Sequence, residues 1–169
     1  MMFKLIGAIF IVASCGGFGF TMAMRHRREV GCLEAFISSL DYMECELGYR
    51  LTPLPDLCRK TAISCGGDIG FFYSNLTKEL EAQIYPNMPA CFRHALSNSN
   101  LPPRCTAIIE KLGVTMGEFT LEGQLRGIDS VRKACEKLLS ELTQDQSQRL
   151  RNYQTLGLCA GAALAILLV

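Results

Sequence analysis

The sequence predicts an all-α protein, a helical bundle of about six helices between an N-terminal and a C-terminal transmembrane helix. Both ends of the chain are apolar, and nearly all charged residues lie between them. In the middle part, apolar residues recur at steps of three and four, the periodicity of a helix that buries one face. We find no stretch of useful length that alternates apolar and polar residues as a half-buried strand would.

The first apolar segment predicts a transmembrane helix over residues 1–24. Leu5 to Met24 carry no charge, and a helix of that length measures about 30 Å, the thickness of the hydrocarbon core. An alternative is a lipoprotein signal peptide cleaved before Cys15, because Lys4 precedes the apolar run. The run continues well past Cys15, which favours an uncleaved span.

The second apolar segment predicts a transmembrane helix over residues 153–169. Leu156 to Val169 alone would measure about 21 Å, so the residues just before Leu156 are needed to lengthen it. Lipid requires every backbone amide to be paired internally, which favours a helix here. Residues 143–152 are polar and contain no helix breaker, and they predict a solvated helical stalk between the bundle and this span.

Basic residues flank both segments on the inner side: Arg25, His26, Arg27 and Arg28 after the first, Arg149 and Arg151 before the second. The positive-inside rule therefore predicts a two-span protein of the cell membrane whose domain, residues 25–152, is cytoplasmic. The nine cysteines are odd in number and include no CxxC pair. Both features favour a reducing compartment.

Charge balance excludes one class of partner. Lys4 is the only charged residue outside residues 25–152, which therefore carry sixteen basic and sixteen acidic residues. A nucleic-acid groove needs a clustered basic excess, so we expect no nucleic-acid partner. The cluster of Arg25, Arg27 and Arg28 is better explained by topology and by contact with anionic lipid headgroups.

The first two helices of the domain have clear boundaries. Residues 29–48 predict a helix with apolar side chains on one face, ended by Gly48. We expect Thr52 to cap the next helix, with Pro53 at its first position, where a missing N–H costs nothing. That helix should end near residues 65–67.

Three shorter helices follow. Asp68 is expected to cap a helix over residues 69–83 that buries Ile69, Phe72, Leu76 and Leu80. Two prolines in residues 85–89 break the pattern before a short helix over 90–97. The next helix spans residues 105–112, and we expect Gly113 to end it, with Gly113 and Gly117 bracketing a tight corner.

Thr120 is expected to cap the last and longest helix. Residues spaced alternately by four and three positions form a largely apolar seam along this helix, which we expect to pack on another helix. The seam consists of Leu121, Leu125, Ile128, Arg132, Cys135, Leu139 and Leu142.

Sequence motifs for catalysis are absent. The chain has no GxxxxGK[ST] loop for a nucleotide. Cys91 and His94 share one face of a predicted helix, but two ligands do not close a tetrahedral metal site. A buried thiol and a partly exposed imidazole explain the pair more simply. We therefore expect no enzyme activity, no cofactor and no metal.

Small residues in the apolar segments offer a packing surface. Gly157 and Gly161 have the GxxxG spacing that lets membrane helices approach closely, although glycine is common in such helices in any case. These two glycines are candidates for packing against the first span or against a neighbouring protein.

Four blocks of sequence, in this order, carry a family resemblance: FKLIGAIF, LEAFISSLDYMECELGY with TPLPD, KLGVTMGEFTLEGQ, and YQTLGLCAGAALAILLV. They resemble stage III sporulation protein AB of endospore-forming bacteria. That family is similar to the cytoplasmic helical domain of type II secretion F proteins, with which it shares a helix, a GE-containing corner and another helix, here Leu112 to Gln124.

The resemblance implies a non-enzymatic platform or scaffold subunit of the channel between mother cell and forespore. It implies a place in the mother-cell membrane around the forespore, with a secretion-type ATPase and other membrane subunits as partners. Gly117 and Glu118 at the corner are the candidate partner contacts, and self-association is left open. The rival hypotheses are a membrane-tethered thiol or metal protein that uses Cys91, His94 and other cysteines, and a helical adaptor outside sporulation.

Overall fold

The computed structural model describes the backbone of residues 2–117 and 120–168 and the side chains of residues 24–117 and 120–144. The elements, in chain order, are α1 (Met2–Arg50), α2 (Leu54–Cys65), α3 (Gly67–Ala82), α4 (Met88–Ser97), α5 (Pro103–Thr115) and α6 (Leu121–Leu168). Within these described residues there is no strand. The all-helical fold and the number of helices that the sequence predicts are confirmed.

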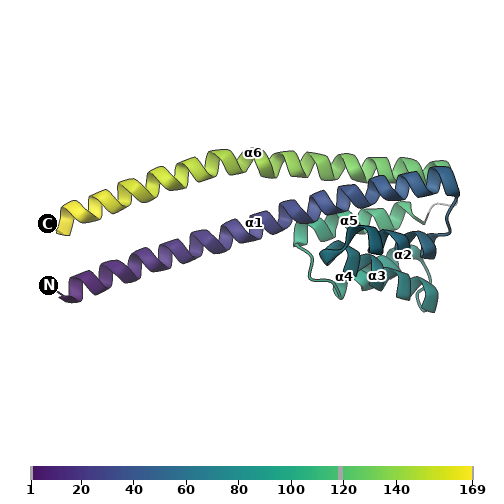
Figure 1. The fold of residues 1–169 in the computed structure, drawn as a ribbon, viewed down its shortest axis with the longest axis horizontal. Helices are drawn as coiled ribbons and strands as arrows, with labels where there is room; N and C mark the ends of the chain where they lie inside the picture. The colour runs from purple at the N-terminus through teal and green to yellow at the C-terminus, as the bar shows by residue number, and fades with distance from the viewer. Residues whose placement is uncertain (1, 118–119, 169) are drawn as a thin grey trace.

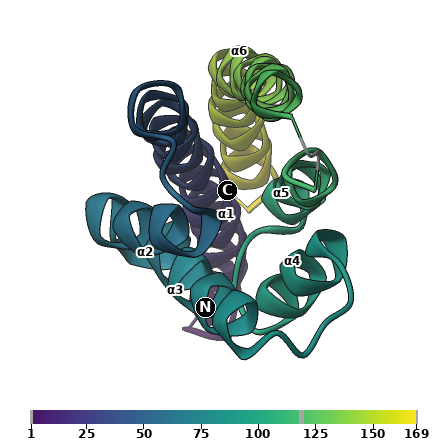
Figure 2. The ribbon, with the colours of Figure 1, turned by 90° about the vertical axis from the view of Figure 1, so that its right-hand side faces the viewer.

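Two long helices form the frame of the molecule. α1 and α6 lie side by side and antiparallel, and α2, α3 and α5 pack against one side of the pair, with α4 packed on α3 and α5 (Figures 1 and 2). α1 contains 49 residues and α6 contains 48. Each helix is unbroken at the boundary that the sequence predicts between the domain and its terminal apolar segment, so the helical stalk is a continuous part of α6.

The core lies where the four short helices meet the frame. The side chains predicted to be buried in α3 are so: Ile69, Phe72 and Leu76 are inaccessible or nearly so, and Leu80 is partly buried. Burial of such apolar side chains stabilises the fold by roughly 1.5–3 kcal/mol each relative to exposure. Phe92 of α4 meets Phe72 edge to face at 5.8 Å between ring centroids.

One polar pair lies within this core. The Ser39 hydroxyl donates to the carbonyl of Phe36 at 2.6 Å, which leaves its oxygen free to accept from the Tyr73 hydroxyl at 3.0 Å. Both side chains are fully buried, and mutual hydrogen bonding removes the penalty for burying them. The pair joins α1 to α3.

Two predicted helix caps are wrong. Thr52 does not cap α2; the extended residue Pro53 precedes that helix without a side-chain cap, and the Thr52 hydroxyl instead donates to Glu46. Asp68 does not cap α3, because that helix begins one residue earlier at Gly67. Asp68 lies in the first turn, where the helix dipole favours a carboxylate, and accepts a hydrogen bond from Arg28.

The predicted cap of the last helix is confirmed, since the Thr120 hydroxyl accepts from the amide of Gly123 at 3.2 Å. α4 has a cap that the sequence analysis missed: the Asn87 side chain accepts from the amide of Ala90 at 3.0 Å. Both arrangements satisfy an amide that the helix itself leaves unpaired.

Gly113 does not end its helix as predicted. α5 continues to Thr115, and Gly113 lies inside it, where a Cβ atom would come within 2.7 Å of the Phe92 side chain. The glycine therefore allows α4 and α5 to pack closely and does not serve as a helix stop. Gly117, by contrast, follows the end of α5 as expected.

In the part of the chain whose side chains are described, we find no helix with the length and apolar character needed to cross a membrane. The predicted spans, residues 1–24 and 153–169, lie outside that part except for Met24. The packing candidates Gly157 and Gly161 also lie outside it.

Candidate partner interface

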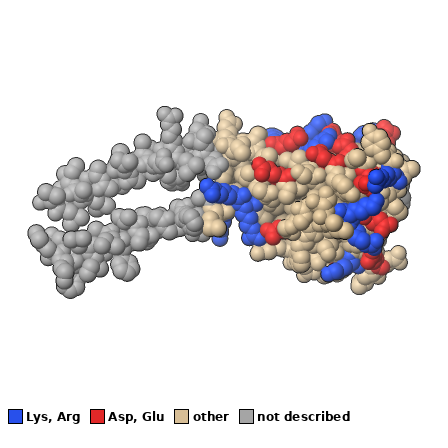
Figure 3. All heavy atoms as spheres, in the orientation of Figure 1, with Lys and Arg blue, Asp and Glu red and all other residues tan. Residues whose placement is uncertain are grey.

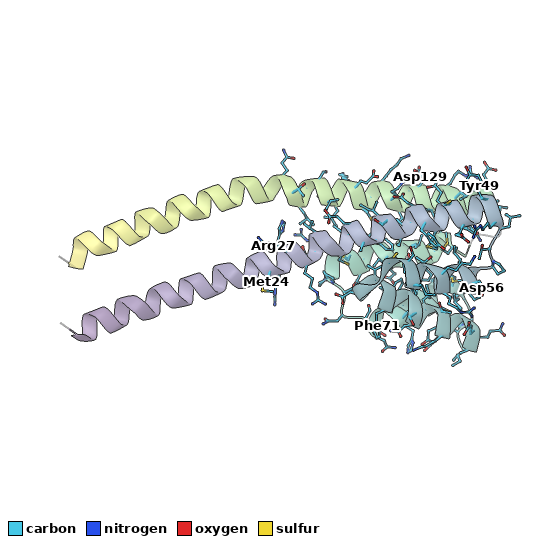
Figure 4. The ribbon with its side chains drawn as sticks, in the orientation of Figure 1. Met24, Arg27, Tyr49, Asp56, Phe71 and Asp129 are labelled. Carbon is cyan, nitrogen blue, oxygen red and sulfur yellow. The ribbon has the colours of Figure 1, made fainter. Side chains whose placement is uncertain are left out.

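One end of the domain carries the exposed chain corners, and we call it the distal end; it comprises Tyr49, Leu51, Asp56, Arg59 and Gly117. Here α1 ends, α2 begins, and α5 passes into α6 (Figure 1). Figure 4 shows Tyr49 and Asp56 at this end, whereas Met24 and Arg27 lie at the opposite one.

Exposed apolar side chains mark the distal end. Tyr49 is 87% exposed and Leu51 is 67% exposed. Leu51 also has a positive φ of 50°, a backbone conformation that L residues with a branched side chain rarely adopt. It persists because the neighbouring residues are fixed: α1 ends at Arg50, and Thr52 is hydrogen-bonded to Glu46.

Glu46 is the buried anion that holds this corner. Its carboxylate accepts from Arg50 at 3.0 Å, Thr52 at 3.1 Å and Lys60 at 2.8 Å. The hydrogen bond from Lys60, followed by that from Thr52 and the charge of Arg50, lowers the pKa of Glu46 although burial opposes the shift. One side chain thereby joins the end of α1, the connecting loop and α2.

Next to this cluster lies an open hollow of about 410 Å³, lined by Arg50, Thr52, Pro53, Asp56, Arg59 and Lys60. Each of its cations already has an acidic partner. Arg50 and Lys60 bind Glu46, and Arg59 binds Asp56 at 2.7 Å and also Glu81. Neutralised cations attract an anionic ligand weakly, so the hollow does not define a phosphate site.

Arg132 joins the two long helices. From α6, its Nη1 donates to Glu44 at 2.8 Å and to Asp41 at 3.1 Å, both on α1, while Nη2 donates to Asp129 at 2.6 Å. The Arg132 side chain is only 26% exposed. These carboxylates, Asp129 and Asp41 first, raise its pKa above the ordinary value, so the guanidinium stays charged. We call these four residues the Arg132 clasp.

The space-filling view shows how the charges are distributed. In Figure 3, acidic and basic side chains gather along the α6 side and at the distal end, with signs interspersed. At the distal end neither sign forms a large single patch, whereas basic side chains gather at the opposite end of the domain. The charged surface of the distal end therefore favours contacts of mixed polarity.

Arg25, Arg27 and Arg28 do not behave alike. Arg25 and Arg27 are exposed. Arg28 donates to Asp68 at 2.8 Å and to the carbonyl of Asn100 at 2.7 Å. It thereby joins α1 to α3 and to the loop before α5, a structural role that the sequence analysis missed.

The predicted corner contacts are only partly described. Gly117 is exposed directly after α5, close to Met88 of α4. Glu118 lies outside the described residues. α5 ends at the distal end (Figure 1), and Gly117 follows two residues after Thr115, the last residue of α5, so it lies at the same end as Tyr49 and Leu51, a connection that the sequence alone did not make.

Cys91 and His94 are not brought together around a common site. Cys91 is buried, whereas His94 pairs through Nδ1 with Glu79 at 2.9 Å and packs on Tyr85 at 4.9 Å between ring centroids. No group of three or more His, Cys, Asp or Glu side chains suited to a metal occurs among the described residues. The hypothesis of a site built on this pair therefore has no geometric support in that part of the chain.

The fold defines a small all-helical protein in which four short helices are carried on two long antiparallel ones. The model of the stage III sporulation protein AB family matches residues 4–169, and the chain belongs to that family. The resemblance found in the sequence is thus confirmed.

Stage III sporulation protein AB of Bacillus subtilis (strain 168) is 23% identical to this chain over 171 residues, which cover 99% of this chain and 100% of that protein. A solved structure of a stage III sporulation protein AB matches with a TM-score of 0.63 and 17% identity, covering 72% of this chain and 98% of the other. At that identity the likeness shows a shared fold.

Proposed function

We propose that this protein is a non-enzymatic platform subunit of a sporulation channel that links mother cell and forespore, and that spore formation requires it. Membership of the stage III sporulation protein AB family supports the role in sporulation. The absence of a nucleotide-binding or catalytic motif from the sequence favours a scaffold over an enzyme.

The observation that carries the proposal is the continuity of α1 and α6. Each helix runs from the distal end of the domain into a terminal apolar segment, over about 70 Å at the usual helical rise. The Arg132 clasp holds the two helices together near the distal end. A partner that binds there would act on a pair of stiff rods and would thereby move the terminal segments.

Residues 1–24 and 153–169 are the membrane spans in this proposal, and residues 25–152 are in the mother-cell cytoplasm. The flanking arginines support that topology. The odd number of cysteines without a CxxC pair supports it too, because it favours a reducing compartment. Arg25 and Arg27 contact anionic headgroups, and Gly157 and Gly161 pack against the first span or other membrane subunits.

A secretion-type ATPase is the proposed partner of the distal end. Tyr49 and Leu51 supply exposed apolar area next to a polar rim that includes Arg59 and Asp56. Such a composition, an apolar centre with polar surroundings, is common at protein interfaces. Gly117 and Glu118 complete the contact at the corner between α5 and α6.

Co-purification tests the partner. We would capture the tagged full-length chain from detergent-solubilised membranes and measure the yield of a secretion-type ATPase from the same organism. The Glu118→Arg and Tyr49→Ser variants should each lower the yield by about tenfold, as expected for loss of one hot-spot contact. Ile63→Ser is the matched control, because Ile63 is 81% exposed but lies near the other end of α2.

Undiminished capture by both distal variants would remove the ATPase assignment. Deletion of the gene tests the wider role: heat-resistant spores should disappear, and the full-length chain supplied in trans should restore them. Normal spore counts after deletion would contradict the proposed requirement for sporulation.

A further inference from the structure

Three segments from distant parts of the sequence meet at the end of the domain opposite the distal end, and we call it the proximal end. It comprises residues 24–29, 66–68 and 97–104. Arg28 of α1 joins them, because it donates to Asp68 at 2.8 Å and to the carbonyl of Asn100 at 2.7 Å. The loop between α4 and α5 is therefore fixed beside the part of α1 that leaves the domain.

The first turn of α5 puts Arg104 at this end. The thiol of Cys105, the next residue, donates to the carbonyl of Glu29 on α1 at 3.8 Å. Arg104 is exposed and makes no ion pair with any other described residue. It does not stabilise α5 either, because the helix dipole disfavours a cation in the first turn. The Arg104 guanidinium is thus available to an external anion.

The proximal end has an excess of two positive charges, although the domain as a whole is balanced. The arginines are Arg25, Arg27, Arg28 and Arg104, and the carboxylates are Glu29 and Asp68. Figure 3 shows basic side chains gathered at this end. The cations around the distal hollow differ, because each of them is paired with a carboxylate.

We propose that the proximal end is a docking surface for an anionic lipid bilayer, in which Arg104 and the loop over residues 98–102 meet phosphate headgroups beside Arg25 and Arg27. The inference rests on the proposed function, in which residues 1–24 and 153–169 are membrane spans. Arginines next to a span meet headgroups in any two-span protein. Contact through Arg104 goes further, because it holds the folded domain itself on the membrane surface.

This contact would select one orientation of the domain. Two spans side by side leave the domain free to tilt toward either side of the pair. α5 packs on one side of that pair, so attraction through its first turn favours tilt toward that side (Figure 2). Each arginine near an anionic surface strengthens the attraction about fivefold. The direction in which Tyr49 at the distal end faces a partner would then depend on lipid charge.

Hydrogen–deuterium exchange of the full-length chain in lipid nanodiscs tests the surface. Discs of phosphatidylcholine are compared with discs of equal parts phosphatidylcholine and phosphatidylglycerol. Amides in residues 98–105 should exchange about fivefold more slowly in the anionic discs. Salt at about 1 M should remove the difference, because it screens charges beyond about 3 Å. Amides in residues 49–56, at the distal end, should exchange equally in both.

Variants of Arg104 separate lipid contact from a structural role. Arg104→Glu should abolish the slower exchange, whereas Arg104→Lys, which keeps the charge, should preserve it. Lys111→Glu is the matched control, because Lys111 is exposed on the same helix farther toward the distal end. Arg104→Glu should melt in detergent at least as high as the wild type, because a carboxylate suits the start of a helix.

Equal exchange in the two kinds of disc, by a chain that has entered both, would overturn this inference and leave the proposed channel role standing. Slower exchange that persists in Arg104→Glu would overturn it too. A chain that does not enter the discs would overturn the two-span topology, and this inference with it.

Discussion

Arg132 of α6 donates to Glu44 of α1 at 2.8 Å, across the seam where the two long helices pack. The same nitrogen reaches Asp41 one turn earlier on α1. Apolar neighbours such as Ile128 and Cys135 are fully buried in this seam, so the Arg132 guanidinium is a charged group within an otherwise apolar helix contact. An apolar seam tolerates slippage, whereas a cation between defined carboxylates fixes one register.

Replacement of Arg132 should therefore loosen the frame. Arg132→Met keeps the apolar stem but leaves Asp41, Glu44 and Asp129 without the cation that they share. We expect the free energy of unfolding to fall by about 1–2 kcal/mol, as for a partly buried charged hydrogen-bond network. Denaturant unfolding followed by circular dichroism measures it.

Arg126→Met is the matched control for this test. Arg126 lies on the same helix but pairs with Glu122 at 3.9 Å on the surface, with both side chains mostly exposed. Loss of that pair should change the free energy by less than about 0.5 kcal/mol. Equal effects of the two substitutions would show that the Arg132 clasp adds nothing beyond a surface ion pair.

Gly113→Ala should destabilise the protein although alanine favours helices. The new methyl group would lie 2.7 Å from Cγ of Phe92, a ring that is fully buried and cannot move aside. Overpacking of this kind costs about 1–3 kcal/mol, more than the gain of roughly 1 kcal/mol in helix propensity.

Gly31→Ala provides the comparison, because a Cβ atom at Gly31 meets nothing within 4 Å. That substitution should raise the free energy of unfolding by up to about 1 kcal/mol. A Gly113→Ala variant as stable as Gly31→Ala would mean that α4 and α5 pack less closely than the structure indicates.

Because of Glu46, the free energy of unfolding should fall as the pH is lowered into the acid range. Its pKa in the folded state lies below the ordinary value of 4.5, because Lys60, Thr52 and Arg50 stabilise the carboxylate. The unfolded chain therefore binds the proton more readily, and the contribution is present above pH 4.5 and is lost as the pH falls through the folded-state pKa. Glu46→Gln should be less stable than the wild type at pH 7.

The difference between wild type and Glu46→Gln should shrink below pH 4.5, measured as free energies of unfolding across a pH series. Glu34→Gln, at an exposed carboxylate of the same helix, should run parallel to the wild type. A constant difference between the wild type and the Glu46→Gln variant at every pH would assign the effect to packing and not to charge.

Arg27 and Arg28 should respond differently to the same substitution. Arg27 is exposed, and its loss should weaken binding of the full-length chain to anionic vesicles by about 1 kcal/mol with little effect on stability. Arg28→Gln should instead lower stability by up to about 1 kcal/mol, because it removes the contacts to Asp68 and Asn100. Vesicle flotation and thermal unfolding separate the two outcomes.

The sequence predicted the structure correctly where a single local property, such as apolar periodicity or capping chemistry, determines it. Apolar periodicity identified the buried face of α3 and the seam of α6 except for Leu121, which is exposed, because burial dominates the other positions. The cap at Thr120 was predictable from local chemistry alone. Thr52 failed as a cap because its hydroxyl donates to Glu46, and Asp68 failed because α3 begins before it, at Gly67.

The interactions that hold the site together could not be predicted in the same way. Arg132 stood out as a charge within an apolar seam, but its partners on α1 depend on the packing of two helices far apart in sequence. The hydrogen bond from the Cys105 thiol to the carbonyl of Glu29 likewise depends only on the tertiary fold. The sequence rule that glycine ends a helix predicted a stop at Gly113, but the structure shows that a glycine is needed there because the ring of Phe92 leaves no room for a Cβ atom.

The central claim is that residues 25–152 face the mother-cell cytoplasm between two uncleaved spans. Labelling of the exposed Cys45 with a membrane-impermeant maleimide tests it most directly, with the modified peptide identified by mass spectrometry. The account predicts an unlabelled Cys45 in intact cells and a labelled one after permeabilisation, on a chain that still contains both terminal segments. Labelling in intact cells, or a mature chain that begins at Cys15, would contradict it.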